Sequence, residues 1–594
     1  MSANPKSIFG AVVAPENPTV LTVQDLTVSV RTKTGLSPLV QHISFDLRRG
    51  ETLAIAGESG SGKSITSLAI MGLLPPPAVR LTGGAILLNG RNLTELSEAE
   101  MRAVRGNRVA MIFQEPMTSL NPVMTIGTQL IEAIRAHETL GRKAARDMAL
   151  SALGAVRLSE PERRMRQFPH ELSGGMRQRV MIAMALALKP EVLIADEPTT
   201  ALDVTVQREV LELLRDLQQA EGTAILLITH DMGVVAEMAD RVIVMCNGRV
   251  EESGNVRQIF AAPGQAYTRD LLAAVPRMGR GGTPRDRAEA PIVAELHDVQ
   301  VRFDIRGGVL NRVTHRVHAV EGVSLDIRAG ETFSLVGESG CGKSTIARAI
   351  VGLVPHNGHI NIAGQTVGTM TAAARRQLSA SAQIVFQDPM AALDPRMTAG
   401  HQIAEPLLIH GDTDAGSRRT RAAELMDRVG LTVAQLDNYP HEFSGGQRQR
   451  ICIARALALR PKLIIADESV SALDVSVQAR VLDLLQTLKE EFGIAMLFIS
   501  HDMAVVENIS DRVAVMYLGQ IVETGSRAQI FGNPQHPYTR RLMAAVPVAD
   551  PEFKRPAELR ISSDIPNVVH PVGTMTARHV MSEVSKGHFV SDVA

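Results

Sequence analysis

Two segments of the sequence have the residue types and spacing of a loop that holds phosphate groups. GESGSGKSIT begins at Gly57 and GESGCGKSTI begins at Gly337, and both contain the pattern G-x-x-x-x-G-K-[ST]. In such a loop the glycines let backbone N–H groups approach phosphate oxygens, the lysine reaches the β- and γ-phosphates, and the serine binds Mg²⁺. One match could be a chance glycine-rich turn, but two matches that each follow an apolar run argue against chance. The predicted nucleotide-binding residues are Gly57, Glu58, Ser59, Gly60, Ser61, Gly62, Lys63 and Ser64, together with Gly337, Glu338, Ser339, Gly340, Cys341, Gly342, Lys343 and Ser344.

A pair of acidic residues follows each loop at a distance. Asp196–Glu197 and Asp467–Glu468 close the apolar runs VLIAD and LIIAD. Because successive side chains of a strand point in opposite directions, the aspartate can face a magnesium ion while the glutamate faces an attacking water. The alternative interpretation is that each acidic pair consists of ordinary turn residues. The pair recurs downstream of both loops, which favours the chemical interpretation.

The same residues recur at a fixed offset, which indicates one duplicated unit. Lys63 and Lys343 are 280 residues apart, and Gln114 and Gln387 are 273 apart. The offset is 271 for the later pairs, which are Ser173/Ser444, Asp196/Asp467, His230/His501 and Tyr267/Tyr538. The first copy has extra residues around LLPPPAVRLTGG (73–84), which its prolines and glycines predict to be a loop.

The elements that must position these residues alternate between strand and helix. Short apolar runs at 192–196, 224–229, 463–467 and 495–500 are typical of strands buried on both faces of a parallel sheet. Between them, Val210, Leu213, Leu214 and Leu217 have helical spacing, as do Val481, Leu484, Leu485 and Leu488. The sequence predicts an α/β fold with a mostly parallel sheet in each half. Segment 275–293, rich in Gly, Pro and Arg, is predicted to be a linker whose arginines are solvated.

Composition narrows the function classes. With 594 residues, 45% of them apolar, the chain can form at least two domains, and 62 Lys and Arg against 63 Asp and Glu give no field that would attract nucleic acid. Three cysteines without CxxC spacing argue against disulfides, a zinc site and an iron–sulfur cluster, and favour a cytoplasmic setting. The first residues include proline and polar side chains where a signal peptide would be apolar, so no secretion is expected, and no apolar run reaches the about 20 residues that span a bilayer.

Two further phrases carry a family resemblance. LSGGMRQR (172–179) and FSGGQRQR (443–450) precede the acidic pairs by the same distance, and each places a serine and two glycines at the start of a predicted helix, which favours an anion. With the P-loops and acidic pairs, these phrases resemble the ATP-binding-cassette ATPases. The resemblance implies two tandem P-loop NTPase domains, each with a helical subdomain, which pack head to tail around two ATP molecules. Lys63 would then share a nucleotide with Ser444, Gly445 and Gly446, and Lys343 would share one with Ser173, Gly174 and Gly175.

The resemblance also assigns individual roles. It implies that Glu197, Glu468, His230 and His501 are catalytic, and that Mg²⁺ is bound by Ser64, Gln114, Asp196, Ser344, Gln387 and Asp467. Gln114 and Gln387 would in addition communicate with a transmembrane partner, and Asp203 and Asp474 would lie in loops that cross the interface of the two cassettes. Phe303 matches an adenine-stacking aromatic, whereas the matching place in the first half is Val30. Ser469 stands where the first half has Pro198, and we still expect two hydrolytic sites.

The ends of the two halves narrow the family. PGQAYTRDLLAAVP (263–276) and PQHPYTRRLMAAVP (534–547) resemble the C-terminal extension of dipeptide, oligopeptide and nickel importer ATPases, and NRVTHRVHAVEGVS (311–324) is similar to the single-chain ATPases of glutathione importers. The resemblance implies an ATP- and Mg²⁺-dependent ATPase at the cytoplasmic face of the bacterial inner membrane. One fused chain would serve two permease subunits and a periplasmic binding protein, and would import glutathione or di- and oligopeptides.

An alternative is a soluble twin-cassette ATPase that acts on ribosomes or nucleic acid. Such proteins need a long charged linker or metal fingers, and this linker is short. The expected organisation is a tail (1–20), cassette 1 (21–275, helical subdomain about 115–172), a linker (276–293), cassette 2 (294–547, helical subdomain about 388–443) and an importer-type extension (548–594). That extension contains no cysteine, so no iron–sulfur cluster is expected there.

Overall fold

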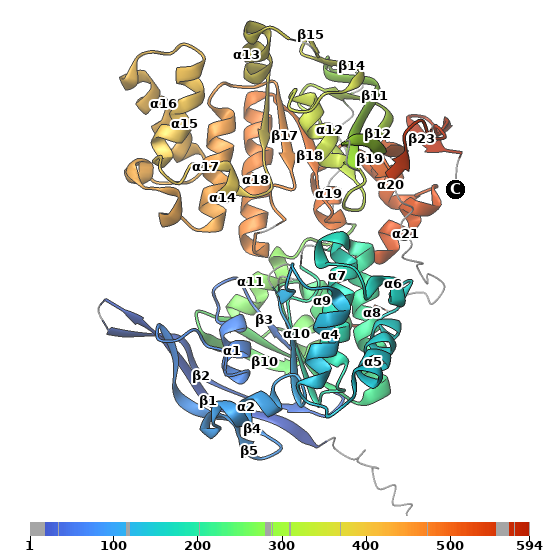
Figure 1. Cartoon of the computed structure of the whole chain (residues 1–594). Helices are drawn as coiled ribbons and strands as arrows, with labels where there is room; N and C mark the ends of the chain where they lie inside the picture. The colour runs from blue at the N-terminus through green and yellow to red at the C-terminus, as the bar shows by residue number, and fades with distance from the viewer. Residues whose placement is uncertain are drawn as a thin grey trace, which may run out of the picture. The chain divides into compact units, whose positions relative to one another are not determined.

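The computed structural model describes residues 18–33, 35–114, 119–200, 202–279, 287, 289–307, 311–368, 370–471, 473–553, 569–574 and 576–592. It divides into two compact units (Figure 1). Unit 1 comprises Met1–Thr200 and Val210–Asp270, and unit 2 comprises Ala201–Glu209 and Leu271–Ala594.

Unit 1 contains an antiparallel sheet and a mostly parallel sheet. The antiparallel sheet, of order β2-β1-β4-β5, is built from β1 (Thr19–Thr32), β2 (Gly35–Arg48), β4 (Val79–Leu88) and β5 (Arg91–Asn92). The parallel sheet, of order β10-β9-β3-β8-β7-β6, is built from β3 (Thr52–Ala56), β6 (Val109–Ile112), β7 (Val192–Asp196), β8 (Ala224–Thr229), β9 (Arg241–Cys246) and β10 (Arg249–Asn255). β10 alone of these pairs antiparallel, with β9.

Helices cover the parallel sheet and form a separate layer after β6. They are α1 (Lys63–Ile70), α2 (Glu98–Val104), α4 (Ile126–Arg135), α5 (Arg142–Ala155), α6 (Pro161–Arg164), α7 (Gly174–Leu186), α8 (Val204–Glu221), α9 (Met232–Met238), α10 (Val256–Ala261) and α11 (Ala266–Ala274). In sequence, the boundary between the units falls within α8 and α11.

Unit 2 repeats this plan with longer sheets. Its antiparallel sheet, of order β15-β14-β11-β12-β21, contains β11 (Ile292–Gly307), β12 (Arg312–Arg328), β14 (Asn357–Ile362), β15 (Gln365–Val367) and β21 (Val569–Pro571). The other sheet, of order β16-β17-β18-β13-β19-β20-β23-β22, contains β13 (Thr332–Val336), β16 (Ala382–Val385), β17 (Leu463–Asp467), β18 (Ala495–Ile499), β19 (Arg512–Tyr517), β20 (Gln520–Ser526), β22 (Met581–Ser585) and β23 (His588–Ser591).

The helices of unit 2 follow the same order. They are α12 (Lys343–Ile350), α13 (Ala372–Ser381), α14 (Pro389–Ala392), α15 (Ala399–Ile409), α16 (Ala415–Arg428), α17 (Gly445–Leu457), α18 (Val475–Phe492), α19 (Met503–Ile509), α20 (Arg527–Gly532) and α21 (Pro537–Ala545). Within this unit, α15 and α16 lie at one end of the main sheet and β11 and β12 at the other (Figure 1).

The predicted parallel core is confirmed. The apolar runs form β7, β8, β17 and β18, whose residues are all buried and pair in parallel with their neighbours. The residues with helical spacing lie on α8 and α18, as predicted. Strands covered on both faces need apolar side chains at every position, which is why continuous runs marked them.

The predicted loop at 73–84 is wrong in its second half. Residues 79–84 belong to β4 and pair with β1, including Val30 with Val79. Gly84 has a φ of 89°, and a Cβ atom there would meet the Asp25 carbonyl oxygen at 2.5 Å. The two glycines therefore serve a bulge in the ladder, where backbones approach closely, and are not loop residues.

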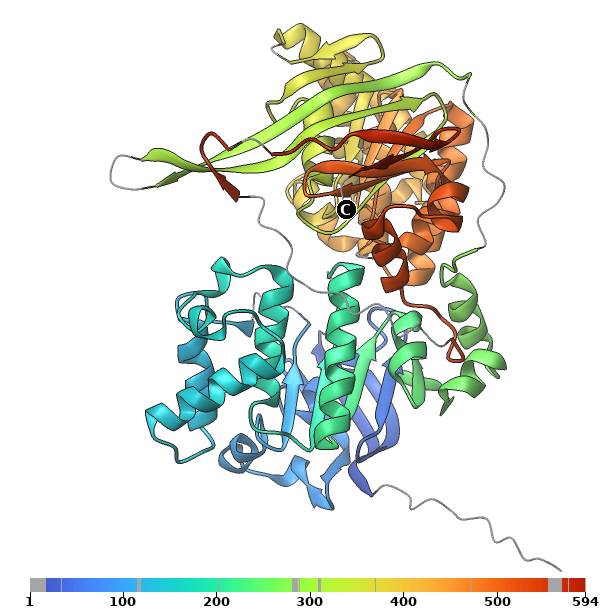
Figure 2. The ribbon, with the colours of Figure 1, turned by 90° about the vertical axis from the view of Figure 1, so that its right-hand side faces the viewer.

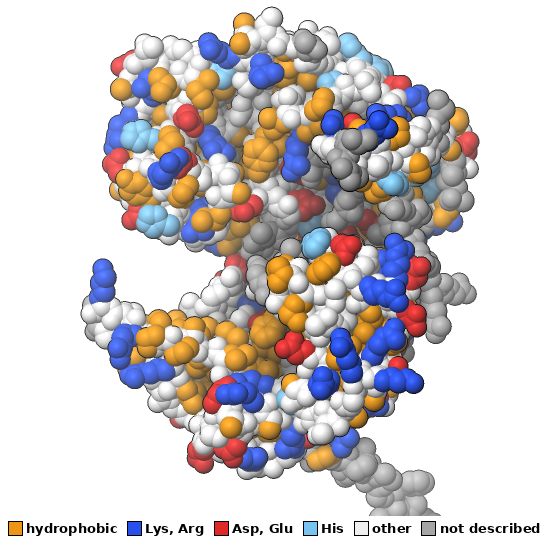
Figure 3. Space-filling model, viewed as in Figure 1, with side chains coloured by type: hydrophobic (Ala, Val, Ile, Leu, Met, Phe, Trp, Pro, Cys, Tyr) orange, Lys and Arg blue, Asp and Glu red, His pale blue; other side chains and the backbone are white. Residues whose placement is uncertain are grey.

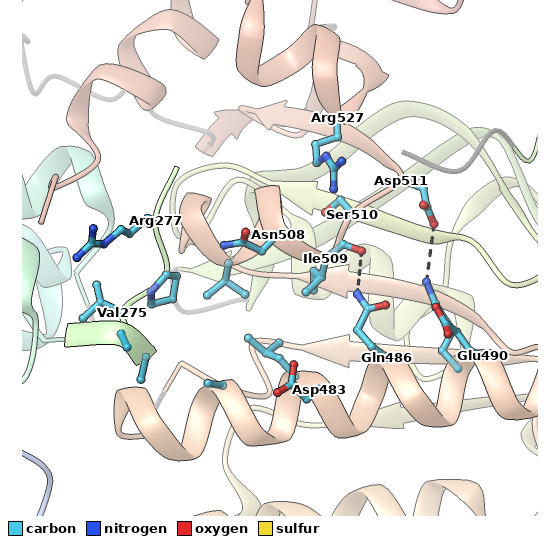
Figure 4. Close-up of a pocket in the computed structure, with 17 residues that line it drawn as sticks. Val275, Arg277, Asp483, Gln486, Glu490, Asn508, Ile509, Ser510, Asp511 and Arg527 are labelled. Carbon is cyan, nitrogen blue, oxygen red and sulfur yellow. Dashed lines mark hydrogen bonds and ion pairs between the residues drawn. The ribbon is translucent and has the colours of Figure 1, made fainter. Parts of the chain in front are cut away.

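The linker arginines are not simply solvated, which corrects the sequence prediction. Arg277 lines a cavity of about 410 Å³ in unit 2, and Figure 4 shows it at the end opposite Asp511. The Arg287 side chain is 25% exposed, and its Nε lies 4.0 Å from an Asp511 carboxylate oxygen. The Asp511 carboxylate accounts for the position of Arg287, and Arg280 and Arg285 lie outside the described residues.

The C-terminal extension adds strands to both sheets of unit 2. β21 pairs with β12, while β23 pairs with β20 and β22 pairs with β23. Figure 2 shows these strands beside the long β11–β12 ribbon. The tail is therefore part of the packed unit and not a separate module.

The surface carries charges of both signs. On the face drawn in Figure 3, basic and acidic side chains are interspersed over each unit. In the part of the chain that the structure describes, none of the helices combines the length and apolar character needed to cross a bilayer.

An arginine ties the antiparallel sheet of unit 2 to its main sheet, and its removal should destabilise that unit. Arg512 pairs with Asp326 at 3.1 Å and with Glu331 at 3.3 Å, and Glu331 is 1% exposed. We expect Arg512→Ala to lower the free energy of unfolding by about 2 kcal/mol, because a buried carboxylate would lose its partner. Urea denaturation checks this.

The control is Arg249→Ala, which removes an exposed bond to Gln41. It should change the free energy of unfolding by less than about 0.5 kcal/mol. Equal effects of the two substitutions would show that the Arg512 pairs do not stabilise the unit.

Candidate nucleotide-binding sites

The two glycine-rich loops join a buried strand to a helix in each unit, between β3 and α1 and between β13 and α12. Gly57 has a φ of 147°, and a Cβ atom there would lie 2.2 Å from the Met245 carbonyl oxygen. Gly337 has a φ of 150° and the same distance to the Met516 oxygen. A glycine is therefore needed at this position by backbone conformation and by space. Lys63 and Lys343 are the first residues of α1 and α12, and a helix N-terminus favours a bound anion.

The loop lysines are buried and held by their own loops. Lys63 Nζ donates to the carbonyl oxygens of Gly57 and Glu58, both at 2.8 Å. Lys343 Nζ donates to Gly337 at 2.7 Å and to Glu338 at 2.9 Å. Each ammonium group is thus fixed over the concave side of its loop, where a phosphate would need it.

Serine and aspartate oxygens meet at the end of each loop. Ser64 Oγ donates to Asp196 at 3.0 Å, and Ser344 Oγ donates to Asp467 at 2.8 Å. Burial raises the pKa of Asp196 to about 6 and also raises the pKa of Asp467. A buried carboxylate whose charge is costly gains from a bound cation, and hydroxyl and carboxylate oxygens are donors that Mg²⁺ prefers.

These residues fit Mg²⁺ as an ion held mainly by substrate. Among the residues that the structure describes, no group of three or more His, Cys, Asp and Glu side chains could hold a metal by itself. Mg²⁺ typically takes one or two protein oxygens together with phosphate oxygens and water. The pairs Ser64–Asp196 and Ser344–Asp467 supply that number.

The second acidic residue lies outside the strand. β7 ends at Asp196, and Glu197 has a φ of 48°; β17 and Glu468 show the same arrangement. The Glu197 N–H donates to the Ile228 carbonyl of β8 at 2.8 Å. The carboxylates of each pair therefore diverge through a left-handed turn residue, and not through strand alternation as the sequence argument assumed.

The structure brings two predicted residues of unit 1, Gln114 and His230, into contact with Glu197. Gln114 Nε2 donates to Glu197 at 2.8 Å, and His230 Nδ1 lies 3.2 Å from the other carboxylate oxygen. Thr200 Oγ1 donates to Glu197 at 2.9 Å, a contact that the sequence analysis missed because nothing in its spacing marked the hydroxyl.

Unit 2 repeats the cluster. Gln387 Nε2 donates to Glu468 at 2.8 Å, and His501 Nδ1 lies 3.6 Å from the same carboxylate. Gln114 and Gln387 thus reach the glutamate through their amide nitrogens. The cluster does not depend on a contact between these amide groups and Asp196 or Asp467, the aspartates that were predicted to bind Mg²⁺.

The glutamate and histidine of each cluster favour each other's charged form. Burial alone would raise the pKa of Glu197, but the hydrogen bond and charge of His230 outweigh it, so the pKa is lowered. Burial would lower the pKa of His230, and Glu197 outweighs it in turn, so that pKa is raised. Glu468 and His501 shift in the same directions for the same causes. An ionised carboxylate beside a histidine is suited to accept a proton from water.

The SGG phrases begin helices, as predicted. Ser173 caps α7 and accepts the Met176 N–H at 3.3 Å, and Ser444 caps α17 and accepts the Gln447 N–H at 3.4 Å. Both serines and the first glycines after them are exposed. Gly446 lies against Val477, whose methyl group would be 2.3 Å from an added Cβ. The exposed N-termini of α7 and α17 are therefore accessible to an anion that is bound outside these helices.

Residues 202–209 contribute to the second loop within unit 2. Asp203 accepts the Ser339 N–H at 2.5 Å, and Thr205 Oγ1 donates to the buried Glu338 carboxylate at 2.7 Å. Burial raises the pKa of Glu338. The sequence analysis named Asp203 but missed Thr205.

The predicted adenine-stacking residue is accessible. Phe303 lies on β11 opposite Val317 of β12 and is 43% exposed, which leaves a ring face for a base. Val30 of β1 is half-buried and offers no ring. The two units therefore differ at this position, as the sequence showed.

Cys341 is enclosed within its loop, and this predicts slow alkylation. It is 6% exposed, its Sγ lies 3.9 Å from Lys343 Nζ, and burial raises the pKa of its thiol. Because the thiolate is the reactive form, we expect Cys341 and the buried Cys452 to react at least about 10-fold more slowly than Cys246, which is partly exposed. Mass spectrometry after timed alkylation checks this, and equal rates for the three thiols would contradict it.

Comparisons with known proteins find relatives over most of the chain. A family model described as ABC transporter matches residues 40–200 and 320–471, and one described as the C-terminal region of oligopeptide/dipeptide transporters matches residues 251–303 and 522–569. The chain is 52% identical to the glutathione import ATP-binding protein GsiA of Salmonella typhimurium (strain LT2) and to that of Escherichia coli O6:H1, with 96% of each chain covered. A solved structure of the bacterial ABC transporter cassette MJ0796 is 28% identical, with 40% of this chain and 99% of that chain covered and a TM-score of 0.36.

Proposed function

The chain belongs to the ABC transporter family, and from that premise we propose that it is the ATP-hydrolysing subunit of an importer for glutathione or for di- and oligopeptides. Its length matches that of relatives named for glutathione import over 96% of both chains. Both repeats of the oligopeptide transporter C-terminal region are present as well.

One observation carries the hydrolytic part of the proposal. Each unit has a half-buried glutamate whose carboxylate contacts a glutamine amide and a histidine, next to a serine–aspartate pair and a lysine loop. A protein with one degenerate site would not keep this cluster twice. Both cassettes are therefore equipped for hydrolysis.

In the proposed reaction, Glu197 or Glu468 accepts a proton from the attacking water, which adds to the γ-phosphorus as the bond to ADP breaks. His230 or His501 keeps the carboxylate ionised and contacts the γ-phosphate. Mg²⁺, when bound at Ser64–Asp196 or Ser344–Asp467, would neutralise charge on the phosphates. The ammonium groups of Lys63 and Lys343 would give up part of their hydrogen bonding to the loop carbonyl oxygens and would bind the β- and γ-phosphates instead.

The proposal includes composite sites. An ATP on the Lys63 loop would also meet the α17 start at Ser444, and an ATP on the Lys343 loop would meet the α7 start at Ser173. The exposed caps and the helix N-termini support this assignment. Binding of two ATP molecules would then favour a closed state of the two cassettes, and hydrolysis would release it.

The chain would act at the cytoplasmic face of the bacterial inner membrane through two permease subunits, with a periplasmic binding protein that selects the cargo. Glutathione is the first cargo to test, because the relatives carry that name. The alternative of a soluble ATPase on ribosomes or nucleic acid has no observation in its favour.

The test is reconstitution of the chain with its permeases and binding protein in liposomes. Glutathione with its binding protein should stimulate ATP hydrolysis, whereas a dipeptide or a pentapeptide in its place reports the other cargo classes. Failure of the chain to associate with permease-containing membranes, together with co-sedimentation with ribosomes, would overturn the importer assignment.

A further inference from the structure

Two tyrosines that the proposed mechanism does not use reach the phosphate-binding loops. Tyr538 Oη accepts the backbone N–H of Glu338 at 3.0 Å, and Tyr267 Oη accepts that of Glu58 at 3.4 Å. Both belong to the Tyr-Thr-Arg phrase at the start of α21 and α11. The same contact thus occurs independently in both units.

We propose that Tyr267 and Tyr538 are positioning residues, which hold the first peptide group of each loop in the orientation that binds the phosphates of ATP. The inference rests on the proposed function, in which these loops bind ATP. It gives the C-terminal importer-type helix a direct role in the nucleotide sites.

One planar peptide group of the second loop has a hydrogen bond at each end. The Gly337 carbonyl and the Glu338 N–H belong to the same plane, which is rigid. Lys343 Nζ donates to that carbonyl at 2.7 Å, and the Tyr538 hydroxyl accepts from that N–H at 3.0 Å. The plane is therefore held at both ends.

A bound phosphate would weaken the bond between Lys343 Nζ and the Gly337 carbonyl oxygen, which lies at one end of this peptide plane. The ammonium group would exchange part of its bonding to the carbonyl for the β- and γ-phosphates. The tyrosine bond does not involve the phosphates, so it can keep the plane in place. Without it, the loop would have to be ordered at the moment of binding, which lowers affinity.

A glutamate on a neighbouring strand fixes the start of the helix that carries each tyrosine. Glu523 of β20 accepts the N–H groups of Gln535 and His536, at 2.8 and 3.0 Å, directly before α21. Glu252 of β10 accepts those of Gly264 and Gln265, at 2.7 and 3.1 Å, directly before α11. The residues that donate differ between the units, but the anchoring of the helix is the same.

Tyr538 is held more firmly than Tyr267. It is 4% exposed, its ring lies 4.3 Å from the Tyr517 ring, and Arg541 lies over it at 5.3 Å. In addition, His588 of β23 contacts Glu523 at 2.8 Å, so the C-terminal tail supports the anchor in unit 2. Tyr267 is only half-buried. Burial raises the pKa of both phenols, which keeps the hydroxyl groups neutral.

The test uses Tyr538→Phe in the full chain, which removes one hydroxyl and keeps the ring. We expect the Kd for ATP at the second loop to rise about 5-fold, the loss of one neutral hydrogen bond. Tyr267→Phe should have a smaller effect, because its bond is longer. In the Glu197→Gln background, where hydrolysis reports unit 2, KM for ATP should rise about 5-fold with little change in kcat.

Tyr517→Phe is the matched control. It removes a hydroxyl from the ring next to Tyr538 and should leave Kd and KM unchanged. If Tyr538→Phe lowers only the melting temperature, or if Tyr517→Phe weakens ATP binding equally, the positioning role is wrong. If the unaltered chain fails to bind ATP, the proposed function itself fails, and the two outcomes are distinct.

Discussion

Replacement of Glu197 and Glu468 by glutamine should nearly abolish ATP hydrolysis while ATP remains bound. The amide cannot accept a proton from water, and general-base catalysis contributes about 10² to 10⁴ in rate. Gln114 and His230 contact the first carboxylate, at 2.8 and 3.2 Å, so the change is confined to the cluster. Phosphate release by the double variant, with ATP binding measured in parallel, checks this.

The two single variants report separately on hydrolysis at the two clusters. Glu197→Gln or Glu468→Gln alone should lower turnover to the rate that the remaining site sustains. Glu100→Gln is the control, since Glu100 caps α2 and pairs with Arg91 at the surface, and glutamine caps a helix as well. Unchanged turnover in Glu468→Gln would show that unit 2 does not hydrolyse ATP.

Replacement of Lys63 and Lys343 by alanine should remove high-affinity ATP binding. Both lysines are at most 5% exposed within their loops, where a charged bond to phosphate is shielded from water. The loss of such a charge partner costs about 100-fold or more in affinity. Each single variant should therefore bind one ATP tightly and the double variant none, as equilibrium dialysis would measure.

The control for the lysines is Lys189→Ala. Lys189 makes a surface ion pair with Glu221 at 2.8 Å and is 68% exposed. It should leave ATP binding unchanged. Tight binding of two ATP molecules by the double loop variant would mean that these loops are not the nucleotide sites.

The sequence predicted the parallel core and named the glutamate, histidine and glutamine of each cluster, but not Thr200. Continuous apolar runs marked β7 and β17, because strands buried on both faces need apolar residues throughout. The resemblance to the ATP-binding-cassette ATPases then named the histidine and the glutamine that contact each glutamate, although it assigned the glutamines to Mg²⁺. Because the residues of such motifs are close in sequence and have fixed spacings, the motifs can be recognised without a structure.

What the sequence could not give depends on contacts between distant segments. The GG pair at 83–84 was expected in a loop, because a bulge and a turn both select glycine. Tyr538 was marked only as a repeated residue within the importer-type ending, since its bond to Glu338 spans 200 residues. The burial of Arg287 beside Asp511 likewise follows from packing alone.

The central claim is that hydrolysis at the two glutamate clusters drives import. Its most direct test is glutathione accumulation in liposomes that contain the whole transporter with Glu197→Gln and Glu468→Gln, ATP being enclosed on the side of this chain. We predict no accumulation, although ATP is bound, and normal accumulation with Glu100→Gln. Accumulation at the unaltered rate in the double variant would contradict the account.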